Sequence, residues 1–338
     1  MIVKSVALIL SLFAFVPSAL ISQEHVIKFA TLAPDGSTWI NVMKEYDSAV
    51  RKESGGRLGF KIYSGGKAGD EKDVLRKIQL GQFHAAGFTG VGLGEIAPKE
   101  RILDSPFLFE NYDEVDYIYK TFDTEFSRAF EDNGYVLLGW AEVGFVYIFS
   151  QSPIYGADDV KKTKMWIWEG DPIAEAALKA LGVSPIPLSI TDVLTSLQTG
   201  LINCVYAPPL GAIALQWFTK LKYMLNVPLA DAAGAVVISK KKFDEFPADL
   251  KEILSRNGRK YMAKLTALSR EDNQKAIETL KKNGVQIIAP HSSKSLQEYS
   301  EIGKQARRML VGKLYAEEFL TRIEKAALDF RTHQKHSK

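Results

Sequence analysis

The sequence predicts an α/β protein of two lobes, and three observations favour this fold class. The chain has 338 residues, more than one core ordinarily supports, which suggests about two domains. From residue 24 onward, short strand patterns alternate with helical patterns, as is typical of α/β layers with parallel strands. Cys204 is the only cysteine, so no disulfide can form within the chain and core packing must hold the fold.

The first half of the chain has the order strand, helix, strand, helix, strand. A strand pattern at residues 26–32 precedes an amphipathic helix, which Ser37 can cap and Gly55 can end. The elements that follow are a strand at 58–62, a helix at 71–80 and a strand at 83–89, which leads into the glycine-rich residues 90–94.

The second half repeats this order. Its expected elements are a strand at 164–168, a helix at 172–181 capped by Asp171, a helix that begins at 191 or 192 and ends at Gly200, and a strand at 202–206. The longest helical pattern covers residues 247–282, which at 1.5 Å per residue is roughly 50 Å, so we expect it to cross both lobes. A last strand at 285–289 precedes a helical stretch at 293–330.

These patterns predict the domain boundaries. We expect lobe I to comprise residues 24–147 and 234–275, and lobe II residues 148–233 and 276–330. Residues 331–338 have the composition of a polar, frayed tail.

Residues 1–22 have the pattern of a signal peptide. Lys4 precedes an apolar run at residues 6–19, which is shorter than the ~20 residues that a membrane span needs. We expect cleavage between Ala19 and Gln23, and no cysteine follows the run to carry a lipid anchor. The alternative is an uncleaved N-terminal anchor helix.

Composition and motifs argue against several function classes. The net charge of +3 comes from 43 basic and 40 acidic residues spread along the chain, so we expect no nucleic-acid partner. The five histidines lack HExxH or paired spacing, no GxSxG occurs, and no base neighbours Cys204. The glycines at 90–94 do not match GxGxxG and more simply allow a tight turn or a close approach to a ligand. We expect no catalytic residue, no metal and no cofactor.

Aromatic residues are the unusual feature of this chain. Trp166 and Trp168 occupy alternate positions of one strand, so both side chains point to the same face. They fit either a core beneath a helix or the wall of a ligand pocket with few polar groups. The candidate ligand-binding residues are Trp39, Phe88, Thr89, Gly90, Phe145, Tyr147, Trp166, Trp168, Ile190, Tyr206, Ala207 and Trp217.

Several segments together carry a family resemblance. They are IKFATLAP at 27–34, SGGR at 54–57, YSGG at 63–66 with the acidic pair at 70–71, SPFLF at 105–109 and TSLQTG at 195–200. In this order and spacing the chain resembles, from about residue 26 to 310, the DctP-type substrate-binding proteins of tripartite ATP-independent periplasmic (TRAP) transporters.

The resemblance implies a type II periplasmic-binding fold, in which crossing strands and a long helix join two lobes that close on a ligand. It also implies a periplasmic location and two partners, a small and a large integral membrane subunit driven by an ion gradient. The implied function is delivery of a ligand without chemistry, so the chain is not expected to be an enzyme.

This chain departs from the family pattern where the ligand is expected. Members usually have an arginine in a KxR pattern, where this chain has Trp166, and a second in a GFR pattern, where it has Val146. The common DGQENP reads NCVYAP at 203–208. Loss of these polar groups together predicts that the organic-acid clamp is absent and that the ligand is hydrophobic or aromatic.

Two alternatives stay open. A carboxylate ligand could be held by Lys67, Arg101 or backbone donors near Gly90. The chain could also be a scaffold that binds another periplasmic auxiliary protein and imports nothing.

Overall fold

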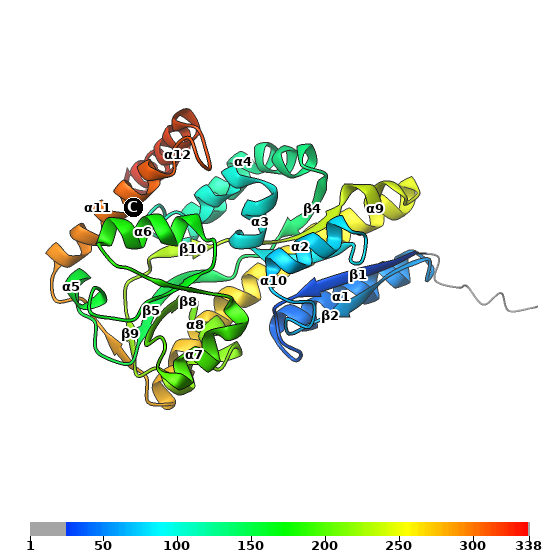
Figure 1. The fold of residues 1–338 in the computed structure, drawn as a ribbon. Helices are drawn as coiled ribbons and strands as arrows, with labels where there is room; N and C mark the ends of the chain where they lie inside the picture. Colours follow the sequence, from blue (N-terminus) through cyan, green and yellow to red (C-terminus); the bar gives the residue numbers. More distant parts are fainter. Residues whose placement is uncertain (1–24, 337–338) are drawn as a thin grey trace, which may run out of the picture.

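Two β-sheets form the centres of two lobes (Figure 1). The structure is a computed structural model and describes residues 25–336, so the predicted signal peptide at residues 1–22 lies outside the described part of the chain. Among residues 25–336, no helix combines the length and the apolar character needed to cross a membrane.

The first lobe contains a five-stranded sheet. Its strands, in spatial order, are β2 (Leu58–Tyr63), β1 (His25–Thr31), β3 (Ala85–Thr89), β11 (Gly234–Ser239) and β4 (Tyr135–Trp140). β1 pairs in parallel with β2 and β3, whereas β11 runs antiparallel to β3 and β4. The helical elements of this lobe are α1 (Thr38–Glu53), α2 (Glu71–Gln79), α3 (Gly90–Ile96), the 3-10 helix η1 (Pro98–Asp104), α4 (Tyr112–Asp132) and α9 (Lys240–Asp244).

The second lobe is built around β5 (Gly144–Ser150). This strand pairs antiparallel with β10 (Ala230–Ala232), β8 (Cys204–Ala207) and β9 (Tyr223–Leu225), and β9 pairs in parallel with β12 (Gln286–Ile288). β6 (Trp166–Trp168) and β7 (Ile186–Leu188) form a separate parallel pair. The helical elements are α5 (Ala157–Val160), α6 (Pro172–Leu181), η2 (Ile190–Asp192), α7 (Val193–Thr199), α8 (Pro209–Ala214) and η3 (Trp217–Lys220).

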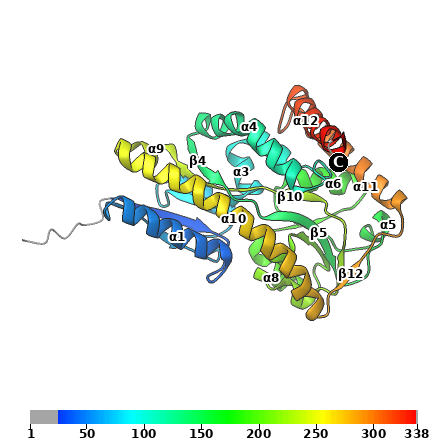
Figure 2. The ribbon, with the colours of Figure 1, turned by 180° about the vertical axis from the view of Figure 1, so that it is seen from behind.

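Helix α10 (Ala248–Lys282) has 35 residues and runs along both lobes (Figure 2). It packs on α1 and β4 in the first lobe and on α8 and β12 in the second. The predicted crossing helix at 247–282 is therefore confirmed. Two further helices complete the chain, α11 (Ser293–Met309) against α6 and α12 (Glu317–His336) against α4.

Local sequence explains the helix ends that were predicted. The Ser37 side chain accepts a hydrogen bond from Ile40 N at the start of α1. Asp171 caps α6 by accepting from Ile173 N, Pro172 follows at the first helical position, and Gly182 ends the helix with φ of 78°. These caps hold α1 and α6 at the two sides of the cleft described below.

Two local expectations were wrong, and a third was less detailed than the structure. Residues 90–94 do not form a turn but begin α3, because Thr89 caps the helix and the glycines let it pack closely on its neighbours. The helical stretch expected at 293–330 is present as two helices, α11 and α12, and a turn with a bridge between Val311 and Tyr315 separates them. Residues 331–336 do not fray but continue α12, where Arg331 donates to the Glu114 carboxylate at 2.7 Å.

The buried Asn273 side chain connects α10 to the start of the second lobe. Its Nδ2 donates to Val143 O at 2.8 Å, and its Oδ1 accepts from Leu210 N at 2.9 Å. Asn273→Ala would leave both backbone groups without this partner, so we expect the free energy of unfolding to fall by about 1–3 kcal/mol. Urea denaturation measures this change. Asn41→Ala removes an exposed amide and should change it by less than about 0.5 kcal/mol; equal losses in both variants would refute the role of Asn273.

Candidate functional site

A cavity of about 630 Å³ lies between the two lobes. It is bordered by the start of α1, the β3–α3 junction and η1 from the first lobe, and by β6, the start of α6 and the β8–α8 junction from the second. Ten of the twelve predicted residues border it, namely Trp39, Phe88, Thr89, Gly90, Trp166, Trp168, Ile190, Tyr206, Ala207 and Trp217. Their role in binding a ligand stays a prediction.

Phe145 and Tyr147 are not among the residues that border the cavity. Side chains alternate along a strand, and on β5 it is Val146 and Ile148 that border the cavity. Phe145 lies on the opposite face of β5 and packs on Tyr112 of α4, with ring centroids 4.7 Å apart. The sequence places these aromatics on the correct strand, but it does not determine which face of the strand meets the cleft.

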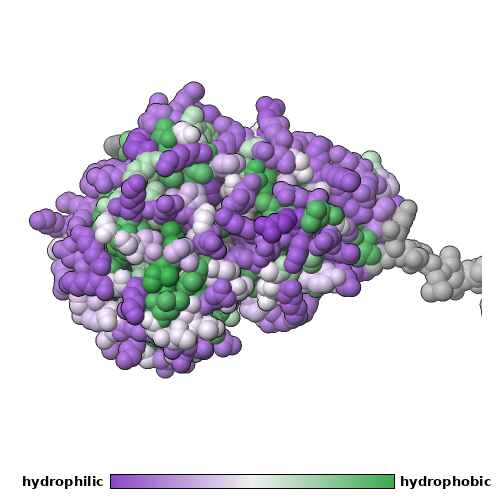
Figure 3. Space-filling view, viewed as in Figure 1, coloured by the Kyte–Doolittle hydropathy of each residue, from purple (hydrophilic) through white to green (hydrophobic). Residues whose placement is uncertain are grey.

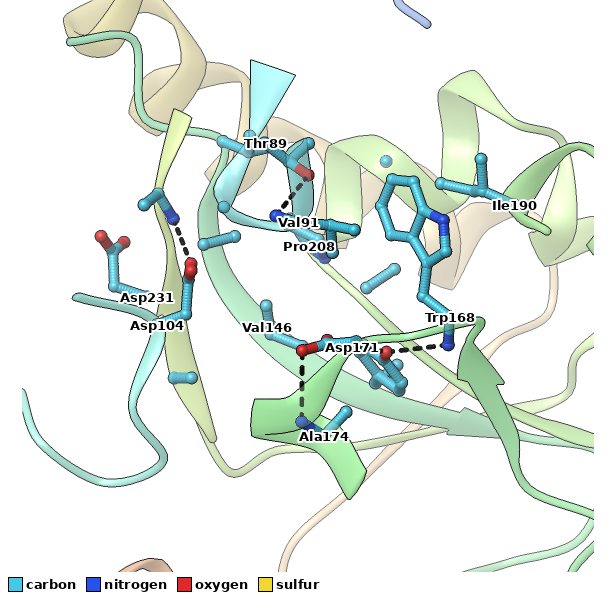
Figure 4. Close-up of a pocket in the computed structure, with 18 of the residues that line it drawn as sticks. Thr89, Val91, Asp104, Val146, Trp168, Asp171, Ala174, Ile190, Pro208 and Asp231 are labelled. Carbon is cyan, nitrogen blue, oxygen red and sulfur yellow. Dashed lines mark hydrogen bonds between the residues drawn. The ribbon is translucent and has the colours of Figure 1, made fainter. Parts of the chain in front are cut away.

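Asp231 of β10 pairs with Phe145 of β5, but unlike Phe145 it is among the residues that border the cavity (Figure 4). Its side chain is fully buried, and among the described residues neither carboxylate oxygen has a hydrogen-bond partner. Burial raises the pKa of Asp231 well above its usual range. A buried acid whose carboxyl oxygens have no hydrogen-bond donor among the described residues therefore borders the cavity.

Four aromatic rings form one wall of the cavity. Trp166 stacks on Tyr206 with ring centroids 4.9 Å apart, and Trp217 meets Trp166 edge to face at 5.3 Å. Trp168 lies 6.3 Å from Trp166 on the same face of β6. Trp166 is only 1% exposed, so it belongs to the core and to the cavity wall at once. The two interpretations of these tryptophans are thus not exclusive.

Three of these four rings, Trp166, Trp168 and Tyr206, have their polar atoms bonded within the protein. Trp166 Nε1 donates to Leu188 O at 3.0 Å, and Trp168 Nε1 donates to the Asp70 carboxylate at 3.2 Å. The Tyr206 hydroxyl accepts from Trp168 N at 3.2 Å. The wall therefore presents mainly ring carbon to a ligand.

A buried ion-pair group adjoins this wall, since the Tyr206 hydroxyl donates to Asp171 at 3.3 Å. Arg101 of η1 donates to Asp104 at 2.7 Å and to Asp171 at 2.6 Å, and its side chain is 4% exposed. Asp104 also accepts from Ala233 N at 2.7 Å, and Asp171 keeps its place as the cap of α6 (Figure 4). The sequence suggested Arg101 only within an alternative and Asp171 only as a helix cap, since no pattern joins residues 70 positions apart.

Glycines make room for this group. A Cβ atom on Gly90 would lie 1.8 Å from Asp104 Oδ2 and 2.3 Å from an Arg101 nitrogen, and one on Gly94 would lie 2.4 Å from Arg101 Cδ. Side chains of the protein itself approach Gly90 closely, and an approach of a ligand to this glycine stays a prediction.

The other groups of the carboxylate alternative do not reach the cavity as free donors. Lys67 pairs with Asp35 at 3.4 Å, is exposed and does not border the cavity. Gly90 N donates to Ala233 O at 3.1 Å, and Gly92 N donates to Glu71 at 2.7 Å.

Burial raises the pKa of two more acids that border the cavity. Burial raises the pKa of Glu71 to about 8, although Thr89 N, Gly92 N and the Thr89 hydroxyl donate to its carboxylate. Burial also raises the pKa of Asp104 to about 6, against the opposing charge of Arg101.

No metal site or reactive thiol is indicated in the described part of the chain. Among residues 25–336, no three His, Cys, Asp or Glu side chains are grouped so that they could hold a metal ion. Burial raises the pKa of Cys204 to about 12, so this thiol is not ionised at neutral pH.

Gly90→Ala tests whether the ion-pair group requires a residue without a side chain at position 90. We expect the added methyl to break the Arg101–Asp104 pair and to lower the free energy of unfolding by about 3–5 kcal/mol. Chemical denaturation provides the measurement. Gly211→Ala is a matched control, because its Cβ would meet no atom closer than 3.6 Å and should shift the value by about 1 kcal/mol or less. Similar losses in both variants would contradict the prediction.

Glu71→Gln tests the raised pKa. The folded protein holds the Glu71 proton up to about pH 8, whereas the unfolded chain releases it near the ordinary value of 4.5. The stabilisation is therefore complete below about pH 4.5 and is lost as the pH rises through 8. We expect the fall in unfolding free energy between pH 5 and 8 to be smaller in the Gln variant. Glu95→Gln, at an exposed ion pair with Lys72, should keep the wild-type slope; an unchanged slope in Glu71→Gln would refute the prediction.

Comparisons with known proteins agree with this architecture. The chain is 25% identical over 311 residues to the 2,3-diketo-L-gulonate-binding periplasmic protein YiaO of Escherichia coli, covering 90% of this chain and 92% of that protein. It is 24% identical to the C4-dicarboxylate-binding periplasmic protein DctP of Rhodobacter capsulatus, covering 81% and 82%. Its fold matches a TRAP periplasmic solute-binding protein of Citrobacter koseri with bound D-glucuronate, at a TM-score of 0.80 and 21% identity over 90% of this chain and 99% of that one.

The family model for bacterial extracellular solute-binding proteins, family 7, matches residues 29–310. This range contains both sheets except for the first strand residues, and all the residues named at the cavity. The chain belongs to this DctP family, the periplasmic solute-binding proteins of TRAP transporters.

Proposed function

We propose that this protein is exported to the periplasm, captures a solute with a largely apolar body in the interlobe cavity, and delivers it to the small and large membrane subunits of a TRAP transporter. The composition of the cavity carries the proposal. The Trp166, Trp168 and Tyr206 wall has its polar atoms bonded internally, and Arg101 is the one Lys or Arg among the described residues that border the cavity.

The physical reason is desolvation. Each Å² of apolar ligand surface buried against this wall contributes about 25 cal/mol, whereas a hydroxyl-rich ligand would lose water and find few free polar groups on the wall. A cavity of about 630 Å³ has the size of ordinary small-molecule sites. No chemical step is part of this proposal.

An organic acid is the second candidate, and the comparisons favour it. The names of both relatives and of the solved structure specify acids, namely diketogulonate, C4-dicarboxylates and D-glucuronate. Arg101 would be the cation that receives the acid, with its Nε buried and without a hydrogen-bond partner among the described residues. A ligand with an acid group on an apolar body would fit both the aromatic wall and the acids that the relatives' names specify.

A panel of three probes separates these ligand classes. Isothermal titration calorimetry on the ligand-stripped protein would compare octanamide, octanoate and D-glucuronate. We expect octanamide to bind at least about tenfold more tightly than D-glucuronate, because its chain buries against the aromatic wall.

The outcomes of this panel are distinct. Octanoate binding well above octanamide would assign an acid group to the ligand, and D-glucuronate binding best would overturn the apolar proposal in favour of the second candidate. Binding of none of the three, together with no small molecule in mass spectra of natively purified protein, would favour the scaffold alternative, which pairs with another periplasmic protein.

A further inference from the structure

The Arg101 ion pairs connect the two lobes across the cavity. Arg101 and Asp104 both belong to η1 of the first lobe, three residues apart. Asp171 precedes α6 of the second lobe and is 70 residues away in sequence. All three side chains are nearly buried and border the cavity. The Arg101–Asp171 pair is therefore a contact between the lobes, and separation of the lobes would break it.

We propose that Asp171 acts as an internal carboxylate ligand of Arg101, so that closure of the cleft excludes small anionic solutes from this guanidinium. The inference deepens the proposed function, on which it rests, by naming a residue that determines specificity. A small carboxylate would have to displace Asp171, because the two anions would compete for the same planar donor group.

Charge and geometry support Asp171 rather than Asp104 in this role. Asp104 shares a short segment with Arg101 and also accepts from Ala233 N, so its pairing does not depend on lobe closure. Asp171 alone brings a carboxylate from the opposite lobe to Arg101. The group already sets two carboxyl groups against one guanidinium, which opposes the entry of a further anion.

A second set of hydrogen bonds also joins the two lobes, and it needs no carboxylate from a ligand. The Asp70 carboxylate of the first lobe accepts from Trp168 Nε1 at 3.2 Å, from Ile190 N at 3.2 Å and from the Ser189 hydroxyl, all in the second lobe. Asp70 and Asp171 thus each accept hydrogen bonds from the opposite lobe. Figure 4 shows Trp168, Asp171 and Ile190 around the cavity.

The Asp171→Asn variant tests the proposal without removing the cap of α6. An asparagine oxygen can still accept from Ile173 N, because Asn and Asp are equally good N-cap residues. Calorimetry with succinate and D-glucuronate should show that the variant binds at least one of them about tenfold or more tightly than the wild type. The double variant Arg101→Gln with Asp171→Asn should lose this gain.

Matched controls exclude effects of net charge or misfolding. Asp192→Asn removes one exposed charge from the same lobe near the cavity mouth, and we expect no gain of acid binding. Asp171→Ser, which also keeps a capping oxygen, should reproduce the gain if the Asn variant melts at a much lower temperature. Small-angle scattering of the ligand-free proteins should give a larger radius of gyration for both Asp171 variants than for Asp192→Asn.

The results separate this inference from the proposed function. If Asp171→Asn binds octanamide like the wild type but gains no affinity for either acid, the inference is overturned and the proposal of an apolar ligand is unaffected. A wild-type protein that already binds D-glucuronate as tightly as the variant overturns the inference and favours the organic-acid candidate. A gain of acid binding by the variant, with no octanamide binding by either protein, supports the role of Asp171 and refutes the apolar ligand.

Discussion

The Arg101 guanidinium is buried between two carboxylates. The residues around it in the cleft are positioned so that this buried charge has partners. An isolated buried cation would cost several kcal/mol, so its partners must be placed accurately. Asp104 comes from the same 3-10 helix, whereas Asp171 must come from the other lobe. Gly90 and Gly94 leave the space that the guanidinium and its stem occupy. The buried charge of Arg101 therefore accounts for the glycines at the start of α3 and for a direct contact between the two lobes.

The aromatic wall of the cavity depends on a different constraint. Trp166 and Trp168 alternate on a short strand, and their indole N–H groups find acceptors outside the cavity, at Leu188 and Asp70. Aromatic side chains with satisfied polar edges form a wall that contributes apolar area and little hydrogen bonding. On the face drawn in Figure 3, apolar residues also gather over the region of α6 and β8, while hydrophilic residues predominate elsewhere. The site thus combines an internally neutralised cation with an apolar wall.

Much of this could be predicted where the controlling interactions are local. The helix at 172–181 is confirmed at both ends, because Asp171, Pro172 and Gly182 determine them within the segment itself. The crossing helix at 247–282 is confirmed for a similar reason, since its apolar stripe continues without a helix breaker. At residues 90–94 the local signal was misleading, because glycines that suit a turn also suit a helix packed closely on Arg101.

The sequence by itself determined the alternation of strands and helices, the long helix across both lobes, and an aromatic strand in the second lobe, because each depends on residues within one element. Only the tertiary structure decided that Val146 rather than Tyr147 borders the cavity, since the face of a strand is selected by what packs on either side. Only the tertiary structure brought Asp171 to Arg101 and Asp70 to Trp168, because these bonds join residues 70 and 98 positions apart whose meeting depends on how two lobes close.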